Sequence, residues 1–229
     1  MNTSFERFVA FEGVDGTGKS YWAEWLRAEL EAVGESVTVT HEPGATPTGL
    51  RLRRLLLEEL PKAPSPDAPD PWTEALLFAA DQAENVSKVI RPALDRGEHV
   101  VADRFYGSSL AYQGELMGCD RNALLRLTDL SLQGVWPGLV IVLDADPRIV
   151  HPGGSDRYEA ASMADMDVVR TGYLCNVERR HDWVMVPVDW RGRRRPFVAI
   201  EGSLRTVLRE RLGWPIPMDE IPVGAELRI

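Results

Sequence analysis

Hydrophobic and polar positions follow two different periods along this chain of 229 residues. Short runs of apolar or β-branched residues predict strands at residues 7–12, 36–40, 98–102, 139–143 and 184–188. Segments in which apolar residues return every three or four positions predict helices at residues 21–33, 48–60, 73–96, 121–133, 161–182 and 202–212. This alternation predicts an α/β fold, with a mostly parallel sheet covered by helices on both faces. The length fits one domain over residues 1–229.

The turn after the first strand carries a phosphate-binding motif. Residues 13–20 read GVDGTGKS, the complete pattern G-x-x-x-x-G-K-[S/T], between a predicted strand and a predicted helix. Glycines let successive backbone N–H groups curl around a phosphate chain, and the start of the helix favours an anion there. In this motif the lysine reaches the β- and γ-phosphates and the serine holds Mg²⁺. The residues expected to hold ATP are Gly13, Gly16, Thr17, Gly18, Lys19 and Ser20.

The predicted helix over residues 73–96 contains two residues with more than one interpretation. An apolar stripe runs from Leu76 to Leu94, and Pro92 is expected to kink or restart the helix because it lacks an N–H. Phe78 and Gln82 lie four residues apart, on a face beside the stripe. An aromatic residue with a polar residue one turn on can hold a flat ring, but the pattern alone favours a core position for Phe78.

Composition excludes several classes of protein. The net charge is −9, which argues against wholesale nucleic-acid binding. No run reaches the roughly 18 apolar residues of a membrane helix, and the N-terminus lacks the pattern of a secretory signal. Cys119 and Cys175 match no metal or redox spacing, so a reduced, cytoplasmic setting is expected. The basic segment 191–195 (RGRRR) and the proline-rich tail from Trp214 are interpreted as exposed surface.

Six stretches together resemble the thymidylate kinase family of P-loop nucleoside monophosphate kinases, which make dTDP from dTMP and ATP. They read FEGVDGTGKS, HEPGATPTG, TEALLFAADQ, VIRPALDRGEHVVADRF, SSLAYQG and DRYE, and they occur in the family's order between residues 5 and 175. The resemblance implies the P-loop NTPase fold, ATP and Mg²⁺, a pyrimidine nucleoside monophosphate as acceptor, and a homodimer.

The resemblance also implies roles for single residues. Asp15 matches an acid that contacts the acceptor's 3′-hydroxyl, and Phe78 matches an aromatic residue that stacks on the base. Arg53, which the pattern alone places on a solvated helix face, matches an arginine on the acceptor phosphate. Asp103 and Arg104 match a pair in which the acid lies near Mg²⁺ and the arginine bridges phosphates.

Further matches concern the acceptor and a lid over about residues 147–160. Ser108, Ser109, Tyr112 and Gln113 match a loop that lines base and sugar, with Tyr112 where it crowds a 2′-hydroxyl. Arg157 matches a lid arginine. The residues expected to act directly in catalysis are Lys19, Asp15, Arg104 and Arg157.

Two departures from the family pattern add alternatives to the predicted function. Gln82 stands where family members usually have an arginine that donates to O4 of thymine, so a cytosine or 5-modified pyrimidine is an alternative acceptor. The lid is short and poor in arginine, with only Arg148 and Arg157, and Gly16 stands where some members have a catalytic arginine. A low-turnover nucleotide-binding module is therefore the alternative from another class.

Overall fold

A parallel sheet of five strands forms the centre of the computed structural model, which describes residues 4–61, 65–150 and 162–217. The strands lie in the order β2-β3-β1-β4-β5, and every neighbouring pair is parallel. Their bounds are β1 Ser4–Glu12, β2 Val37–His41, β3 His99–Asp103, β4 Trp136–Asp144 and β5 Trp183–Pro187. All five predicted strands and the predicted α/β fold are confirmed.

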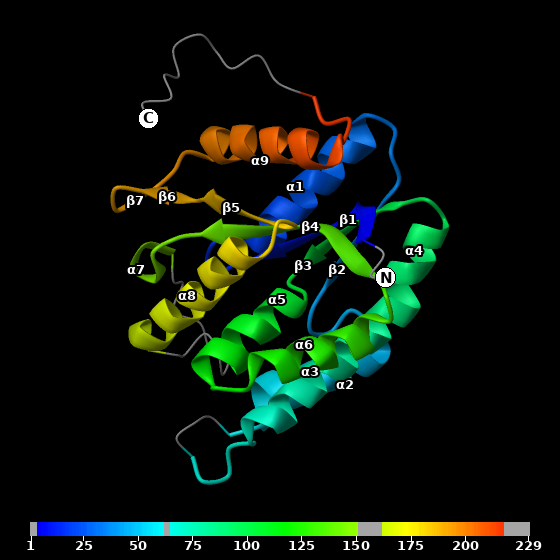
Figure 1. Ribbon diagram of the computed structural model, residues 1–229. Helices are drawn as coiled ribbons and strands as arrows, with labels where there is room; N and C mark the ends of the chain where they lie inside the picture. Colours follow the sequence, from blue (N-terminus) through cyan, green and yellow to red (C-terminus); the bar gives the residue numbers. More distant parts are fainter. Residues whose placement is uncertain (1–3, 62–64, 151–161, 218–229) are drawn as a thin grey trace.

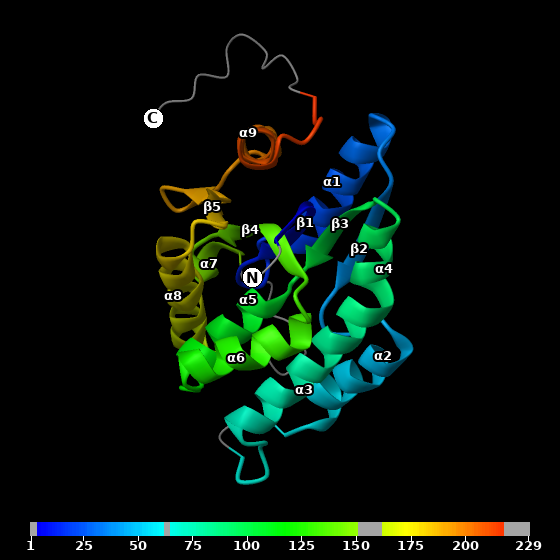
Figure 2. The ribbon, with the colours of Figure 1, turned by 45° about the vertical axis from the view of Figure 1, so that its right-hand side comes forward.

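The central strands are buried on both faces, which explains their continuous apolar sequence. Phe8, Val9, Ala10 and Phe11 of β1 have no exposed surface. Helices cover both sides: α1 (Lys19–Ala32) and α9 (Phe197–Leu212) lie on one face, and α5 (Tyr106–Ser109) and α8 (Met163–Arg179) lie on the other (Figures 1 and 2).

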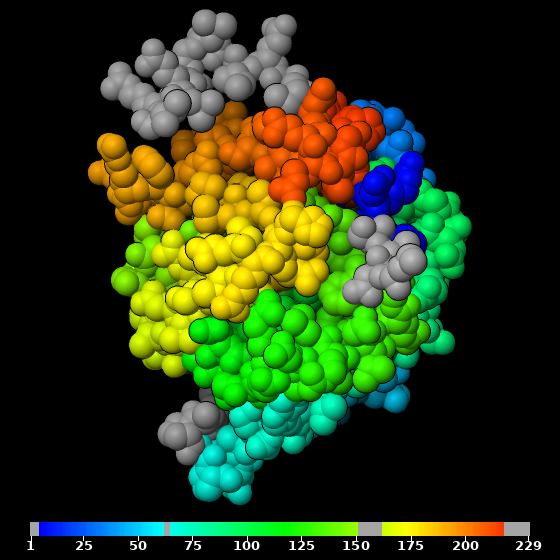
Figure 3. Space-filling model, in the orientation of Figure 1, coloured from blue at the N-terminus to red at the C-terminus, as the bar shows by residue number. Residues whose placement is uncertain are grey.

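The remaining helices extend the second face beyond the sheet. The segment η3 (Leu110–Leu116) packs against α8, and Figure 3 shows the yellow residues of α8 and the green residues below them as one continuous surface. The bounds of these remaining helical segments are α2 Pro47–Arg54, η1 Leu55–Glu59, α3 Pro71–Asn85, η2 Val86–Ile90, α4 Arg91–Asp95, η3 Leu110–Leu116, α6 Arg121–Leu132 and α7 Pro147–Val150. The segments η1, η2 and η3 are π-helical turns that continue the helices before them.

Pro92 restarts the helix, as expected from its missing N–H. The α-helical hydrogen bonding of α3 ends at Asn85, η2 follows, and α4 begins at Arg91 with the proline in its first turn.

Three local expectations are wrong. The α3 stripe does not face the core at its start: Leu76 is 56% exposed, whereas Asp81 and Gln82 are buried. Residues 107–114, interpreted as a loop, are helical in α5 and η3, and α9 begins at Phe197 rather than at residue 202. By contrast, the basic segment 191–195 is exposed from Arg191 to Arg194, as expected, and it forms part of a small antiparallel hairpin of β6 (Asp189–Trp190) and β7 (Arg193–Arg194).

Candidate active site

The phosphate loop lies between β1 and α1, pressed against the end of β4. Gly13 has φ +135°, and a Cβ there would lie 2.4 Å from the Leu143 carbonyl oxygen, so only glycine fits this approach. Lys19 Nζ donates to the carbonyl oxygens of Gly13 and Val14 at 3.1 and 3.0 Å. Burial, together with the neighbouring Arg104 charge, lowers the pKa of Lys19 to about 8. The loop therefore holds a buried cation at the start of a helix.

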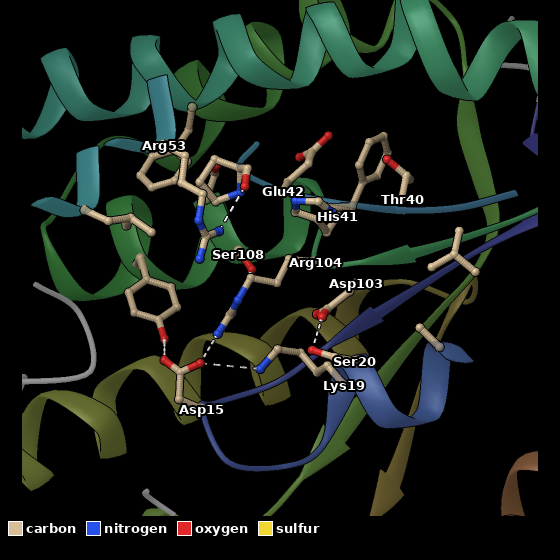
Figure 4. A pocket seen from close by; sticks show the side chains of 18 of the residues that line it. Asp15, Lys19, Ser20, Thr40, His41, Glu42, Arg53, Asp103, Arg104 and Ser108 are labelled. Atoms are coloured by element: carbon tan, nitrogen blue, oxygen red, sulfur yellow. Dashed lines mark hydrogen bonds and ion pairs between the residues drawn. The ribbon is translucent and has the colours of Figure 1, made fainter. Parts of the chain in front are cut away.

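Asp15 joins the phosphate loop to the end of β3. Its carboxylate accepts a hydrogen bond from the Arg104 guanidinium, forms an ion pair with Lys19 at 3.7 Å, and accepts from the Tyr112 hydroxyl at 3.3 Å (Figure 4). Burial raises the pKa of Asp15, but the Arg104 and Lys19 charges outweigh it and hold that pKa at about 2. Asp15 is therefore ionised at neutral pH and orients both cations.

Arg104 adopts a backbone conformation that is unusual for a residue other than glycine. Its φ is +68°, in the left-handed region that costs energy for a side chain with a Cβ. Its N–H bonds to the Phe11 carbonyl at 2.9 Å, and its guanidinium donates to Ser108 Oγ at 3.2 Å as well as to Asp15. The turn after β3 is therefore strained at Arg104, and this conformation holds the guanidinium in a fixed place at the carboxyl edge of the sheet.

Glu12 is a buried acid beside the site that the sequence interpretation did not single out. It is fully buried at the end of β1 and accepts from the backbone N–H groups of Phe105 and Ser108 at 2.9 and 3.1 Å. Its other oxygen accepts from Ser108 Oγ at 2.7 Å and from the Tyr173 hydroxyl of α8 at 3.3 Å. Burial raises the pKa of Glu12. An acid at the end of an otherwise apolar strand was the available signal, because charged residues are rarely buried without partners.

The acceptor-side residues line the same cavity as the phosphate loop. Its volume is about 750 Å³, and Arg53, Phe78, Ser109, Tyr112 and Gln113 line it together with Lys19 and Ser20. Figure 4 shows Arg53 on one side of this cavity and Asp15 with Lys19 on the other. The structure therefore brings together residues from four separate segments: the start of α1, α2, α3, and the continuous segment of α5 and η3.

Arg53 reaches the cavity over the loop that follows β2. Its guanidinium donates to the Pro43 carbonyl at 3.0 Å. Gly44 allows this path, because it has φ +115° and a Cβ there would lie 2.9 Å from Arg53 Cδ. The interpretation of Arg53 as a solvated residue is therefore replaced by one in which it faces the cavity.

Gln82 does not lie where the sequence interpretation placed it. It is 5% exposed, and its amide nitrogen donates to Glu42 at 3.1 Å while its amide oxygen accepts from Ser131 Oγ at 2.6 Å. It is not among the residues that line the cavity. In α3, Phe78 faces the cavity, whereas Gln82 points away from it, toward Glu42 and Ser131 of α6. The prediction that Gln82 contacts the edge of the base is therefore wrong.

Two buried acids lie next to each other at one side of the cavity: Glu42, which lines it, and Asp81, which does not. Burial and the Asp81 charge raise the pKa of Glu42 well above its usual value. Asp81 is 2% exposed; burial raises its pKa to about 6, although the Gly44 N–H donates to one of its oxygens at 3.0 Å. Its second oxygen has no hydrogen-bond partner among the described residues. The folded state therefore favours a protonated Asp81.

This pKa predicts a pH-dependent stability. The folded-state pKa of Asp81 is about 6 against 3.8 for the free group, so its stabilising contribution is present at low pH and lost as pH rises through 6. Asp81→Asn should stabilise the protein by roughly 2–3 kcal/mol at about pH 8, and the gain should shrink near pH 4.5. Urea unfolding at both pH values measures this. Asp129→Asn, at an exposed position, is the control; a pH-independent difference for Asp81→Asn would contradict the prediction.

Part of the expected machinery falls outside the described residues. Arg157 and most of the lid lie within residues 151–161, and most of the tail lies within residues 218–229. Arg148, the other lid arginine, is paired with Asp146 and Asp167 at 3.1 and 3.0 Å. In the part of the chain that is described, no helix has the length and apolarity needed to cross a membrane.

Comparisons with known proteins identify the family of this chain. The thymidylate kinase family model matches residues 11–188. The chain belongs to the thymidylate kinase family. A thymidylate kinase of Synechococcus sp. (strain CC9605) is 37% identical over 90% of this chain and 98% of its own length. That of Bifidobacterium longum (strain NCC 2705) is 45% identical over 73% of this chain and 82% of its own.

Solved structures give the same family. The crystal structure of thymidylate kinase from Ehrlichia chaffeensis superposes with a TM-score of 0.65 at 28% identity, covering 80% of this chain and 88% of that one. Membership confirms the predicted P-loop fold and the prediction of an ATP-dependent nucleoside monophosphate kinase.

Proposed function

We propose that this member of the thymidylate kinase family transfers the γ-phosphoryl group of ATP to the phosphate of dTMP, giving dTDP and ADP. The observation that carries the proposal is the single cavity in which the phosphate loop and the acceptor-side residues meet. A kinase of this type must hold two phosphate groups end to end, with water excluded. A cavity of about 750 Å³ suits a nucleotide-sized ligand.

The charges of the cavity fit phosphoryl transfer between two anions. Lys19 would hold the β- and γ-phosphates of ATP, Arg53 would hold the acceptor phosphate, and Arg104 would lie between them. Asp15 keeps Lys19 and Arg104 in place and would accept from the acceptor's 3′-hydroxyl. No side-chain base is needed, because the attacking oxygen already belongs to a phosphate anion.

Mg²⁺ is part of the proposal. Ser20 Oγ donates to the Asp103 carboxylate, so two oxygen ligands of the kind that Mg²⁺ prefers lie together at the cavity. Among the described residues, no group of three or more acids, histidines or cysteines is placed so that it could hold a metal ion by itself. This fits an ion held by one or two protein oxygens plus substrate phosphates. When bound, Mg²⁺ would neutralise charge on the phosphate oxygens.

Gln113 supports a base with a carbonyl group. Its side chain is 1% exposed and lines the cavity, and its amide nitrogen has no hydrogen-bond partner among the described residues. Such a donor suits a carbonyl oxygen of thymine held against Phe78 and Tyr112. Buried polar groups are nearly always paired, so an unpaired one in a cavity points to a ligand.

Gln113→Leu should separate binding from folding. The KM for dTMP should rise about ten-fold or more, because a buried hydrogen bond to the base is lost. Thermal stability should stay equal or increase, because an unpaired buried amide is removed at similar volume. Steady-state kinetics and thermal unfolding of the same preparation measure both. An unchanged KM would show that Gln113 does not contact the base.

An ADP-release assay with dTMP, dUMP, dCMP, CMP and 5-hydroxymethyl variants as acceptors tests the function. We expect the highest kcat/KM with dTMP. A preference for a 4-amino or 5-modified base would establish the alternative acceptor. ATP binding without turnover on any acceptor would establish the low-turnover module.

Three further proposals concern the assembly, the location and the lid of the protein. We propose a homodimer, a cytoplasmic location and a lid arginine at Arg157. Size-exclusion chromatography with light scattering tests the first, and Arg157→Ala kinetics test the last. Cys119 and Cys175 are both free thiols, which is consistent with a reducing compartment.

A further inference from the structure

The hairpin of β6 and β7 brings an arginine to the phosphate loop. The Arg194 guanidinium donates a hydrogen bond to the carbonyl oxygen of Gly16, although 178 residues separate the two in sequence. The hairpin stands out from the surface at one edge of the molecule (Figures 1 and 3). One hydrogen bond engages only one of the five N–H donors of a guanidinium.

The base of the hairpin is anchored firmly, which fixes where Arg194 lies. Arg195 donates to the carbonyl oxygens of Pro187 and Ala199 at 2.6 and 3.1 Å. Asp189 accepts from the Asp146 N–H at 3.1 Å. Because both ends of the hairpin are held, its two short strands carry Arg194 as a fixed projection rather than a freely moving loop.

A second contact ties this region to the helix behind the phosphate loop. Phe197, three residues after Arg194, packs edge-on against Tyr21 with ring centroids 5.1 Å apart. It also packs against Trp22 at 5.6 Å. Both aromatic residues belong to the first turn of α1, directly after Ser20. The path from the hairpin to α9 is therefore seated against the start of the phosphate-binding helix.

Arg194 differs in its electrostatics from the other arginines on this side. Arg148 is paired with two carboxylates, and Arg170 binds Asp144 through both its nitrogens at 2.7 and 2.8 Å. Within the described ranges, Arg194 forms no ion pair and bonds only to a neutral carbonyl oxygen. Its cross-strand neighbour Asp189 forms no ion pair with it and accepts instead from the Asp146 N–H, so most donors of the Arg194 guanidinium stay available for a ligand.

We infer that Arg194 is a donor-side cation whose guanidinium contacts the phosphate chain of ATP in the nucleotide-bound protein. The inference rests on the proposed kinase function. Phosphoryl transfer depends on cations around the phosphates, and Gly16 itself supplies no side chain. The exposed side chain of Arg194 needs only rotation about its own bonds to exchange one carbonyl for phosphate oxygens, which are the stronger acceptors.

Four variants test this inference: Arg194→Ala, Arg194→Gln, Arg194→Lys and the control Arg193→Ala. Arg193 neighbours Arg194 on the same strand, and its side chain points to the opposite face. Arg194→Ala and Arg194→Gln should lower kcat/KM for ATP about ten-fold or more, with the KM for dTMP changed less than about two-fold. Arg194→Lys should retain most of the activity, and Arg193→Ala should match the wild type.

The Gln and Lys variants separate charge from loop support. Glutamine keeps a neutral donor for the Gly16 carbonyl, so full activity in Arg194→Gln would mean that Arg194 only supports the loop and would overturn the inference. Equal kinetics for Arg194→Ala and Arg193→Ala would overturn it as well. If Arg194→Ala does not fold, the comparison of Arg194→Gln with Arg194→Lys tests the inference by itself.

Calorimetric titration with ATP, ADP and AMP provides a readout that does not depend on turnover. The loss of affinity in Arg194→Gln should be largest for ATP and absent for AMP. An equal loss for all three nucleotides would contradict the inference. A wild-type protein that binds ATP but phosphorylates no acceptor would refute the proposed function while leaving this titration valid.

Discussion

Lys19→Ala is expected to lower kcat by about a hundred-fold or more, because one charge-assisted contact to the transferring phosphoryl group disappears. The Lys19 side chain is 6% exposed, and its ammonium is held by two loop carbonyl oxygens and by Asp15. Removing it takes away a buried cation whose partners are otherwise arranged around it. Steady-state turnover with saturating ATP and dTMP measures the effect.

The chain offers a matched control for this substitution. Lys88 is exposed on η2, and Lys88→Ala should leave kcat unchanged. Circular dichroism must show that the Lys19→Ala protein is folded. Near-normal turnover in a folded variant would reject a catalytic role for the phosphate loop.

Arg53→Ala is the second substitution with a large expected effect, and it should act on the acceptor. We expect kcat/KM for dTMP to fall between about ten- and a hundred-fold, because charge-assisted hydrogen bonds to the acceptor phosphate are lost. ATP affinity should change little, because Arg53 approaches the cavity from α2 rather than from the phosphate loop. Kinetics with each substrate varied in turn separate the two effects.

Arg54 is the matched control. It follows Arg53 on the same helix, is exposed, and pairs with Glu59 at 2.7 Å. Arg54→Ala should change neither substrate's KM. If both variants lose the same amount of activity, the effect comes from the helix and not from a contact with phosphate.

The phosphate loop and the five strands were predictable from the sequence, because each is determined by residues that are adjacent in the chain. The phosphate loop needs glycines, a lysine and a serine at fixed spacing, and a strand and helix on either side, so residues 13–20 specify it locally. The five strands were recognisable because a buried parallel strand requires a continuous apolar run. The roles of Arg53 and Phe78 came from resemblance alone. The sequence pattern by itself favoured a solvated face for Arg53 and a core position for Phe78.

Contacts between segments far apart in sequence were not predictable. Helical spacing put Gln82 near Phe78, but it could not give the rotation of α3 against β2 and α6, and this rotation directs the amide to Glu42 and Ser131.

The sequence alone therefore determined the fold class, the phosphate loop and, through resemblance, the family, because local spacing and strand burial are written in consecutive residues. Only the tertiary structure decided which side chains meet at the cavity. The bonds of Glu12 to the turn after β3, and of Arg194 to Gly16, each join residues more than 90 positions apart. Such pairs are set by how the helices and the hairpin pack on the sheet, and no periodicity in the chain records that packing.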